Sequence, residues 1–316
     1  MKNRILVINM VENLIIIGSG PAGLTAALYA SREGYKPMVI TGAVAGGQLL
    51  LTTIVENYPA FPDGVLGSEL IDLMRKQAER FGTKFLGEDV SDIDISKKPF
   101  TVKTNSNSYQ AHSIIIATGA SARWLGIESE KRFIGKGVSS CATCDGPFFK
   151  NKDVVVVGGG DTAMEDSLFL TKFAKSVTIL HRRDSFRASK IMQDKVAANP
   201  KIKVLFNTVI EEIVGDAKIN GVKIKDIKTG AVSQLTVDGV FVAIGHKPNT
   251  EFLKSKLKLD ENGYIITKSE VFTEVDGLFV AGDVADHRYR QAITAAGSGC
   301  KAALEARAYL IKFNLA

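Results

Sequence analysis

Two segments of the chain share one pattern: an apolar strand-like run, a cluster of glycines, and small residues with helical spacing. The first occupies residues 14–32 around Gly18-Ser19-Gly20-Pro21-Ala22-Gly23, and the second occupies residues 154–172 around Gly158-Gly159-Gly160-Asp161-Thr162-Ala163. Fully apolar strands suit a parallel sheet that helices cover on both faces. We therefore expect an α/β protein with two Rossmann-like dinucleotide-binding folds.

The first glycine cluster matches the full G-x-G-x-x-G fingerprint. Gly18 permits a tight turn, Gly20 lets the backbone approach a pyrophosphate, and Gly23 allows the helix to pack closely. A helix N-terminus at this point offers backbone amides to the anion. The alternative is a glycine turn without a ligand, and the strand before and helix after the cluster count against it.

One feature of the fingerprint is missing from this first segment. The next strand, residues 38–40, leads into Thr41 and Gly42, where an Asp or Glu would bind a ribose hydroxyl. The ribose then needs another partner, which we expect in the following turn, Gly46-Gly47-Gln48.

The second cluster reads G-x-G-x-x-A, with Gly158, Gly160 and Ala163 in the three places. The strand that follows ends in His181-Arg182-Arg183, with Arg187 one turn further on. Arginine in place of the acid suits a 2′-phosphate, because its planar, permanently charged fork grips phosphate oxygens. This pattern favours NADPH over NADH, and a solvated basic turn is the alternative.

Other apolar runs end in small residues at positions 114–119, 240–245 and 278–283, where a doubly wound sheet binds its ligands. An alanine-rich amphipathic pattern over residues 291–313 indicates a final helix.

The length of 316 residues allows two domains with separate cores. We place the boundaries near residues 121–124 and 247–250. The first domain is then discontinuous, with residues 1–121 and 250–316, and the second domain, residues 122–249, is inserted into it.

Cys141-Ala142-Thr143-Cys144 is a close cysteine pair. A two-residue spacer at a turn or helix start can bring the two Cα atoms to the roughly 5.5 Å that a disulfide needs. Zinc is the competing interpretation, but a structural zinc site needs four ligands and the chain has no second C-x-x-C. Asp145 follows directly, either as a proton donor or acceptor for a thiolate or as a plain turn residue.

The sequence also predicts the burial of three further residues. Cys300 is expected as a small buried residue of the last helix. Phe148 and Phe149 are expected in the core. The alternative for the two phenylalanines is an aromatic surface beside the cysteines that docks a protein substrate.

The net charge of +6 comes from 40 Lys and Arg interleaved with 34 Asp and Glu, which does not indicate a nucleic-acid surface. Three cysteines with one close pair point to a reducing compartment, the cytoplasm. Lys2 and Arg4 before a short apolar stretch resemble a signal peptide, but residues 14–17 are needed as a strand. No run reaches the roughly 18 apolar residues of a membrane span. Met10 could serve as an alternative start, which would make the first nine residues dispensable.

The chain also carries a longer series of motifs in a fixed order: Gly18-Ser19-Gly20-Pro21-Ala22-Gly23, Gly46-Gly47-Gln48-Leu49, Ala117-Thr118-Gly119-Ala120, Cys141-Ala142-Thr143-Cys144-Asp145-Gly146, His181-Arg182-Arg183, Ala281-Gly282-Asp283-Val284 and Arg290-Gln291-Ala292. In this order and spacing, from about Val11 to the end, the chain closely resembles the bacterial-type, low-molecular-weight thioredoxin reductases. The family pattern Gly-Gly-Gly-x-Thr-Ala-x-Glu-Glu has Asp166 in its last place here, which is a conservative change.

The resemblance implies FAD at the first fold, with Asp283 on the ribityl chain, and NADPH at the inserted fold. It implies Cys141 and Cys144 as the redox pair, Asp145 as the acid, and a homodimer. In that family the dithiol lies on the NADPH domain, so the domains must rotate to present first the nicotinamide and then the dithiol to the flavin. The expected FAD residues are Gly18, Gly20, Pro21, Ala22, Gly23, Thr41, Gly42, Gly47, Gln48, Asn57, Thr118, Gly119, Gly282, Asp283, Arg290, Gln291 and Ala292. The expected NADPH residues are Gly158, Gly160, Asp161, Thr162, Ala163, His181, Arg182, Arg183, Arg187, Ile244 and Gly245.

The implied activity is NADPH-dependent reduction of thioredoxin. A peroxiredoxin-linked reductase would carry an extra N-terminal region, a ferredoxin reductase would lack the C-x-x-C, and a glutathione-reductase type would place C-x-x-x-x-C near the first fold. A binding module that keeps both folds but has lost catalysis is the alternative from another class, and the dithiol and arginines count against it. We expect no metal, nucleic-acid or membrane partner.

Overall fold

The computed structural model describes residues 6–43 and 45–315, so part of the expected N-terminal segment lies outside the described residues. The chain divides into two compact units. Unit 1 takes in the described residues up to Leu50, together with Ile54–Ser121 and Lys247 onward. Unit 2 consists of Leu51–Thr53 and Ala122–His246.

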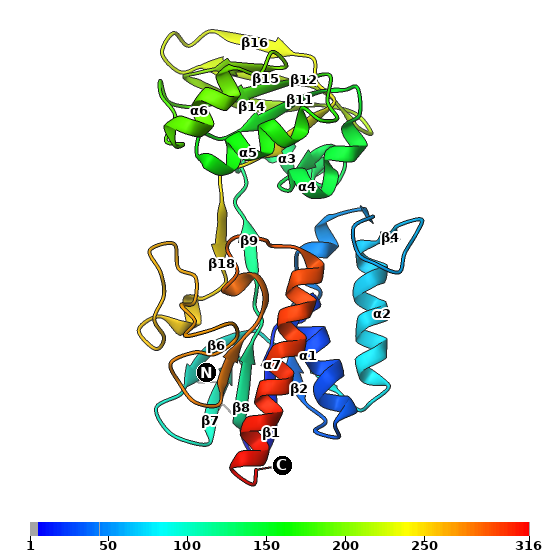
Figure 1. Ribbon diagram of the computed structural model, residues 1–316, viewed down its shortest axis with the longest axis vertical. Helices are drawn as coiled ribbons and strands as arrows, with labels where there is room; N and C mark the ends of the chain where they lie inside the picture. Colours follow the sequence, from blue (N-terminus) through cyan, green and yellow to red (C-terminus); the bar gives the residue numbers. More distant parts are fainter. Residues whose placement is uncertain (1–5, 44, 316) are drawn as a thin grey trace. The chain divides into compact units, whose positions relative to one another are not determined.

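Unit 1 is built on a seven-stranded sheet with the order β5-β2-β1-β8-β7-β6, in which β19 also pairs with β8 (Figure 1). The strands β5, β2, β1, β8 and β19 run parallel, whereas β8, β7 and β6 form an antiparallel meander. The elements of this unit and of the two chain crossings are β1 (Leu6–Ile17), α1 (Pro21–Arg32), β2 (Met38–Ile40), η1 (Gly47–Leu51), β3 (Ile54–Val55), β4 (Val65–Leu66), α2 (Gly67–Glu79), β5 (Lys84–Leu86), β6 (Val90–Asp94), β7 (Phe100–Thr104), β8 (Asn107–Ile116), β9 (Ala120–Ala122), β18 (His246–Pro248), η3 (Glu251–Leu253), β19 (Leu278–Val280), η4 (Gly282–Val284) and α7 (Ala292–Lys312).

Strand β1 shows why this sheet has two covered faces. Leu14 and Ile16 belong to the core under α1 and α7, while Ile15 and Ile17 belong to a second core on the opposite face. Successive side chains of a strand point to opposite faces, so a fully apolar strand needs cover on both. The strand begins at Leu6 rather than at the expected Leu14, because its first half also pairs with β8.

Helices α1 and α7 pack against each other with unusually small side chains at the contact (Figure 1). Ala22, Ala26 and Ala27 of α1 and Ala302, Ala303 and Ala306 of α7 are all buried. Gly299 of α7 comes so close to α1 that an added Cβ would lie 2.1 Å from the carbonyl oxygen of Ala22. Small residues therefore let α7 reach the segment that holds the first glycine cluster.

Unit 2 repeats the parallel plan with a five-stranded sheet in the order β10-β17-β11-β12-β13. One face packs against α5 and α6, and the other against the antiparallel strands β14-β15-β16 (Figure 1). Its elements are α3 (Glu128–Phe133), β10 (Val138–Ser139), α4 (Ala142–Asp145), η2 (Gly146–Phe149), β11 (Asp153–Val157), α5 (Asp161–Leu170), β12 (Ser176–Leu180), α6 (Lys190–Ala197), β13 (Ile202–Leu205), β14 (Thr208–Gly215), β15 (Ile219–Asp226), β16 (Val232–Leu235) and β17 (Gly239–Val242).

The expected α/β class with two Rossmann-like folds is confirmed. The final helix, expected over residues 291–313, is α7. In the part of the chain that the structure describes, no helix combines the length and the apolar composition that crossing a membrane requires.

The contact between α1 and α7 predicts opposite effects for two glycines of the same helix. Gly299→Ala should lower the free energy of unfolding by about 1–3 kcal/mol, because the new methyl group has no room. Gly297→Ala is the matched control: no atom lies within 4 Å of the added Cβ, so helix propensity should raise stability by up to about 1 kcal/mol. Urea denaturation followed by circular dichroism measures both. Equal effects of the two substitutions would contradict the close approach of α7 to α1.

Candidate functional site

The first glycine turn, defined as Gly18–Gly23, joins β1 to α1 and uses its three glycines differently. An added Cβ at Gly18 would lie 2.2 Å from the carbonyl oxygen of Ala117, and one at Gly23 would lie 2.0 Å from that of Gly18. Both glycines are therefore required by packing inside the protein. At Gly20 the backbone is extended, and an added Cβ would meet nothing within 4 Å. Only a group from outside the chain gives a reason for glycine there.

Several expected residues converge on this turn. An added Cβ at Gly47 would lie 3.6 Å from the Cα of Gly20, and one at Gly282 would lie 2.9 Å from the Cβ of Ala22. The buried Ser19 joins two more segments, since its hydroxyl donates to the carbonyl of Thr41 (3.2 Å) and accepts from the amide of Gly46 (3.0 Å). The sequence analysis did not single out Ser19, although it lies inside the fingerprint.

Asn249 is a second residue that the sequence analysis missed. Its side-chain amide donates to the carbonyl of Thr118 (2.8 Å), and its backbone amide donates to that of Gly119 (3.0 Å). The Thr118 hydroxyl donates back to the carbonyl of Asn249 (2.9 Å). Asn249 thus fixes the turn after β8, where Gly119 has a positive φ of 67°. The sequence marked this position only as part of a domain boundary.

Asp283 lies in η4, beside the first glycine turn in the fold. Burial first, and then the neighbouring Asp286, raise the pKa of its carboxyl group, and against the opposing effect of Arg290 the net result is a pKa of about 7. The carboxyl accepts no hydrogen bond from any residue that the structure describes. A partly buried carboxyl without a donor fits a ligand that supplies hydroxyl groups.

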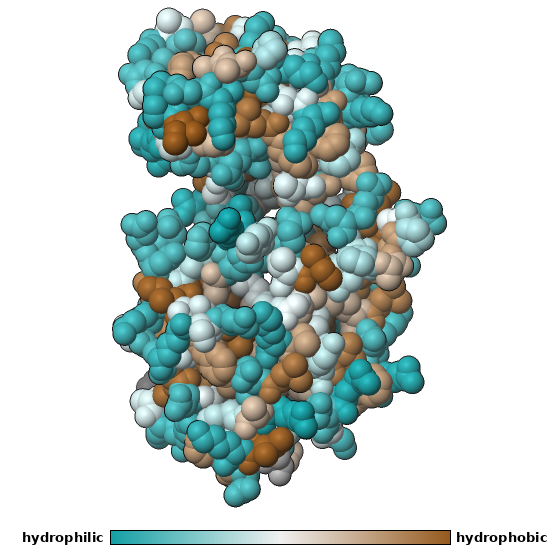
Figure 2. Space-filling view, viewed as in Figure 1, coloured by the Kyte–Doolittle hydropathy of each residue, from teal (hydrophilic) through white to brown (hydrophobic). Residues whose placement is uncertain are grey.

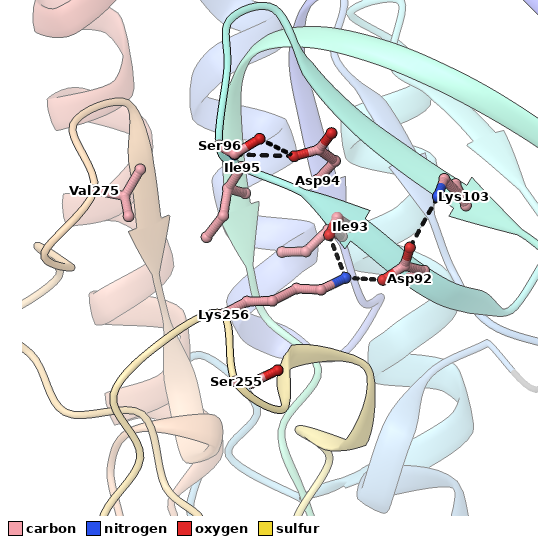
Figure 3. Close-up of a pocket in the computed structure, with 9 residues that line it drawn as sticks. All are labelled: Asp92, Ile93, Asp94, Ile95, Ser96, Lys103, Ser255, Lys256 and Val275. Carbon is pink, nitrogen blue, oxygen red and sulfur yellow. Dashed lines mark hydrogen bonds and ion pairs between the residues drawn. The ribbon is translucent and has the colours of Figure 1, made fainter.

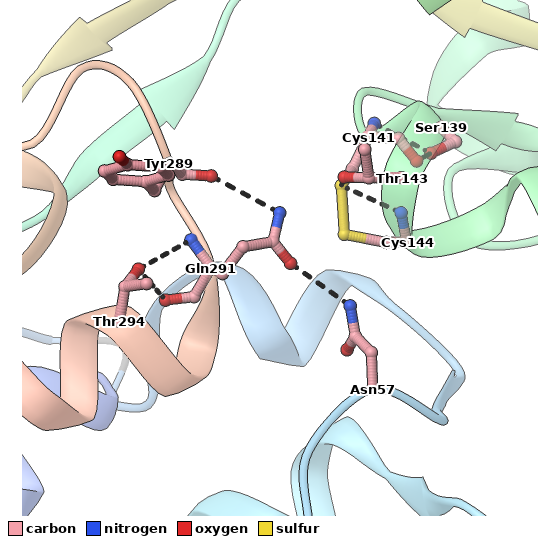
Figure 4. Close-up of a disulfide and its surroundings, with 8 residues drawn as sticks. All are labelled: Asn57, Ser139, Cys141, Thr143, Cys144, Tyr289, Gln291 and Thr294. Atoms are coloured by element: carbon pink, nitrogen blue, oxygen red, sulfur yellow. Dashed lines mark hydrogen bonds between the residues drawn. A yellow bond between two sulfur atoms is a disulfide. The ribbon is translucent and has the colours of Figure 1, made fainter. Parts of the chain in front are cut away.

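Asn57 and Gln291 contact each other at the start of α7. The Asn57 amide donates to the side-chain oxygen of Gln291 (3.1 Å), and the Gln291 amide donates to the carbonyl of Tyr289 (3.3 Å) (Figure 4). The backbone N–H of Gln291 donates to the hydroxyl of Thr294 (3.3 Å), which completes a capping box. Gln291 therefore also fixes the beginning of α7, and Asn57 bonds to its side chain there.

The second glycine turn, defined as Gly158–Ala163, repeats this division of roles. An added Cβ at Gly158 would lie 2.4 Å from the carbonyl oxygen of Ala243, so packing requires this glycine. Gly160 is extended, and nothing lies within 4 Å of an added Cβ there. Helix α5 starts at Asp161, and its N-cap residue, Gly160, has no side chain to bond to the first amides. Ile244, after β17, is exposed, and Gly245 has a positive φ of 98°.

The arginine turn, defined as residues 181–189, follows β12. The side chains of Arg182, Arg183 and Arg187 are exposed, and no described carboxylate lies within ion-pair distance of them. Three cations close together without acidic partners fit an anionic ligand. His181 is different: only 5% of it is exposed, so its ring is part of the interior.

Cys141 and Cys144 form the expected disulfide at the start of α4, with their Cα atoms 5.3 Å apart (Figure 4). The Cys141 sulfur accepts the backbone N–H of Cys144 (3.2 Å) and lies 3.4 Å from the hydroxyl of Thr143. Burial raises the pKa of Asp145, whereas a hydrogen bond with Ser139 lowers it. The described residues contain no cluster of three or more His, Cys, Asp or Glu that could hold a metal ion.

Two sequence expectations need correction. Phe149 is buried and packs edge-on against Phe241, with ring centroids 5.1 Å apart, but Phe148 is 37% exposed. Phe148 follows Pro147 in a one-turn helix that can bury only one of two adjacent rings. Cys300 is only half buried, and its side chain contacts Tyr29 of α1, which is itself exposed.

A surface pocket in unit 1 (Figure 3) has none of the expected site residues in its lining. Its charged groups are already satisfied by one another: Lys256 binds Asp92 and the carbonyl of Ile93, Lys103 lies 3.0 Å from Asp92, and Ser96 donates to Asp94. The charged side chains of the pocket therefore already have partners within its own lining.

The chain matches one protein family and is similar to several proteins named thioredoxin reductase. A family model described as pyridine nucleotide-disulphide oxidoreductase matches residues 12–299. The thioredoxin reductase of Rickettsia conorii is 54% identical over 304 residues, which cover 95% of this chain and 98% of that protein. The solved thioredoxin reductase of Giardia duodenalis is 44% identical with a TM-score of 0.91, over 95% of this chain and 98% of that one. The one from Streptococcus pyogenes is 41% identical with a TM-score of 0.93, over 97% and 100%.

The raised pKa of Asp283 predicts a pH-dependent stability difference in flavin-free protein. With a folded pKa of about 7 against a reference value of 3.8, the folded state holds the proton more tightly, so stability falls as the pH rises from about 4 to 7. Asp283→Asn should therefore raise the free energy of unfolding by up to about 4 kcal/mol at pH 8 and change it little below pH 4. Denaturant titrations across this pH range measure the difference, and a gain that did not vary with pH would contradict the assignment.

Proposed function

Because the chain belongs to the pyridine nucleotide-disulphide oxidoreductases, and among them to the thioredoxin reductases, we propose a specific role for each of its two folds. The enzyme reduces the disulfide of thioredoxin with electrons from NADPH. We assign FAD to the fold of unit 1, NADPH to the fold of unit 2, and the redox step to the Cys141–Cys144 disulfide. The observation that carries this proposal is the oxidised dithiol on a chain with two open glycine turns.

The first glycine turn supports FAD binding through its open position at Gly20 and the uncapped amides of α1. Asp283 would hold hydroxyl groups of the ribityl chain, for which its carboxyl has free acceptor capacity. The turns at Thr41 and Gly47 would take the place of the absent ribose acid. We assign to FAD the residues Gly18, Gly20, Pro21, Ala22, Gly23, Thr41, Gly42, Gly47, Gln48, Asn57, Thr118, Gly119, Gly282, Asp283, Arg290, Gln291 and Ala292.

The second glycine turn and the arginine turn support NADPH binding. The open position at Gly160 would admit the pyrophosphate, and the exposed guanidinium groups would grip the 2′-phosphate. We assign to NADPH the residues Gly158, Gly160, Asp161, Thr162, Ala163, His181, Arg182, Arg183, Arg187, Ile244 and Gly245.

A bound flavin supplies two-electron transfer between a nicotinamide and a disulfide. After reduction of the Cys141–Cys144 bond, the backbone N–H of Cys144 and the hydroxyl of Thr143 would hold Cys141 as a thiolate. Asp145, whose pKa burial raises, would deliver a proton to the other sulfur. Reduction of the disulfide by two electrons and one proton thus gives one thiolate, at Cys141, and one thiol, at Cys144.

The thiolate of Cys141 would attack the disulfide of thioredoxin, forming a mixed disulfide and releasing one thioredoxin sulfur. Cys144 would then return its proton to Asp145 and, as a thiolate, attack the Cys141 sulfur, which restores the intramolecular disulfide and releases the second thioredoxin sulfur. Phe148, exposed three residues after Asp145, offers an apolar contact to the protein substrate. We assign this chemistry to Cys141, Cys144 and Asp145.

Single cysteine variants test the order of these steps. Cys144→Ser should lose thioredoxin reduction by more than about a thousandfold and accumulate a covalent complex through Cys141, because the resolving sulfur is gone. Cys141→Ser should be equally inactive and trap little complex. NADPH should still bleach the flavin in both variants. Non-reducing gels and turnover assays measure these outcomes, and a Cys141→Ser enzyme with wild-type turnover would remove the dithiol from the mechanism.

We further propose a homodimer that works in the cytoplasm, where a reducing environment suits a cycling dithiol. A row of exposed apolar side chains follows one side of α7: Ile293, Leu304 and Ile311 are 44%, 42% and 51% exposed. Their spacings of 11 and 7 residues keep them on one side of the helix. Figure 2 shows hydrophobic patches at intervals along α7, and this α7 row supports contact with a second copy of the chain.

Leu304→Glu tests this dimer. Placing a charge in the row should shift the mass in light scattering from twice the chain mass of 34.1 kDa towards the single chain. Ile266→Glu is the matched control, because Ile266 is also exposed, at 51% against 42% for Leu304, but lies outside α7. A Leu304→Glu protein that stays dimeric at low micromolar concentration would show that α7 is not the interface.

A further inference from the structure

His181 is the buried member of a basic turn whose arginines are exposed. Its ring lies against Gly159, and ring atoms would stand 2.2–2.7 Å from an added Cβ on that glycine. On its other side, Nε2 lies 3.0 Å from the carbonyl oxygen of Ser185. The imidazole therefore packs between the second glycine turn and the arginine turn.

Backbone hydrogen bonds join the same two turns directly. The carbonyl of Gly159 accepts the amides of Arg187 (2.8 Å) and Ala188 (3.2 Å). Because both of these backbone amides donate to the same carbonyl oxygen, the arginine turn lies close to the second glycine turn at Arg187. The backbone of the arginine turn is thus fixed, while its guanidinium groups extend into solvent.

Asp161 makes a third connection from the first position of α5. Its Oδ1 accepts both the amide (3.0 Å) and the hydroxyl (2.8 Å) of Ser189 at the far end of the arginine turn. These two bonds lower the pKa of Asp161, so its carboxylate is ionised at neutral pH. A carboxylate at this place would repel a nucleotide phosphate rather than bind it.

The charge of His181 also argues against direct phosphate binding. Burial lowers the pKa of the imidazole, against the opposite effect of the hydrogen bond with Ser185. Arg183 and Arg187, the charged groups facing the ring, lower that pKa as well. A neutral, buried ring adds no positive charge to an anion site.

We propose that His181 and Asp161 are positioning residues for nucleotide specificity: together they hold the arginine turn at a fixed distance from the second glycine turn. The inference rests on the proposed NADPH site. The 2′-phosphate and the pyrophosphate of one nucleotide are a fixed distance apart, so two separate anion sites must keep a matching distance. A misplacement of about 1 Å in such an arrangement can cost up to a hundredfold.

Asp161→Ala separates positioning from charge, and Asp184→Ala is its matched control. Both substitutions remove one negative charge from the same region. Asp184 makes a long 3.8 Å ion pair with Lys228 and accepts the hydroxyl of the adjacent Ser185 (3.3 Å), so it does not join the arginine turn to the glycine turn. If charge alone mattered, both variants would bind 2′,5′-ADP more tightly than the wild type. Positioning predicts that Asp161→Ala binds it roughly ten to a hundred times more weakly, whereas Asp184→Ala does not weaken binding.

The measurement is calorimetric titration of the FAD-loaded enzyme with 2′,5′-ADP, together with KM and kcat for NADPH and NADH. Asp161→Ala and His181→Ala should raise KM for NADPH about tenfold or more, leave kcat within about twofold, and change KM for NADH much less. Arg183→Ala serves as the reference for loss of a direct contact. Asp161 is exposed, so its variant folds even if His181→Ala does not.

Two outcomes would overturn the inference. One is an Asp161→Ala enzyme that binds 2′,5′-ADP as tightly as Asp184→Ala, and the other is an equal loss for NADPH and NADH. A wild-type enzyme that did not distinguish the two nucleotides, or that was indifferent to Arg183→Ala, would instead remove the NADPH assignment itself.

Discussion

The first amides of a helix have no partner inside the helix, and this constraint governs both Rossmann folds of the chain. The N-cap residue of α1 and of α5 is a glycine, so no N-cap side chain bonds to those amides. The glycine before each helix, Gly20 or Gly160, faces space that no described atom fills. The protein thus leaves backbone donors beside open space at the ends of two buried strands. An anionic group of a dinucleotide is the partner that satisfies both requirements.

Equal backbone geometry does not make the two sites equivalent, because the surrounding charges differ in sign. Beside the first turn stands a carboxyl group, Asp283, whose pKa of about 7 reflects a place poor in water and in donors. Beside the second turn stand exposed guanidinium groups without acidic partners among the described residues. The first environment suits a ligand rich in hydroxyl groups, and the second suits an additional phosphate. One fold used twice can therefore bind two different nucleotides.

The sequence predicted those features that depend on local pattern. The glycine fingerprints located both turns, and the apolar runs located the parallel strands, because backbone packing leaves few other residues at these places. Ser19 and Asn249 were missed because their hydrogen bonds join segments far apart in the sequence. The exposure of Phe148 and Cys300 depends on which neighbours happen to cover a side chain, and no local pattern records that. The early start of β1 likewise depends on the length of its partner β8.

His181 illustrates a limit of motif reasoning that applies to any basic run at a strand end. In His181-Arg182-Arg183 the three residues are all potential cations, yet β12 directs the first into the interior and releases the next two to solvent. A motif records which residues occur together but not which of them touches the ligand. The residues that touch an anion act through their charge and their donors, whereas those that set the distance between two anion sites act through their shape and their bonds to the backbone. Nucleotide preference in such a fold is therefore a property of the whole pair of turns rather than of its arginines alone.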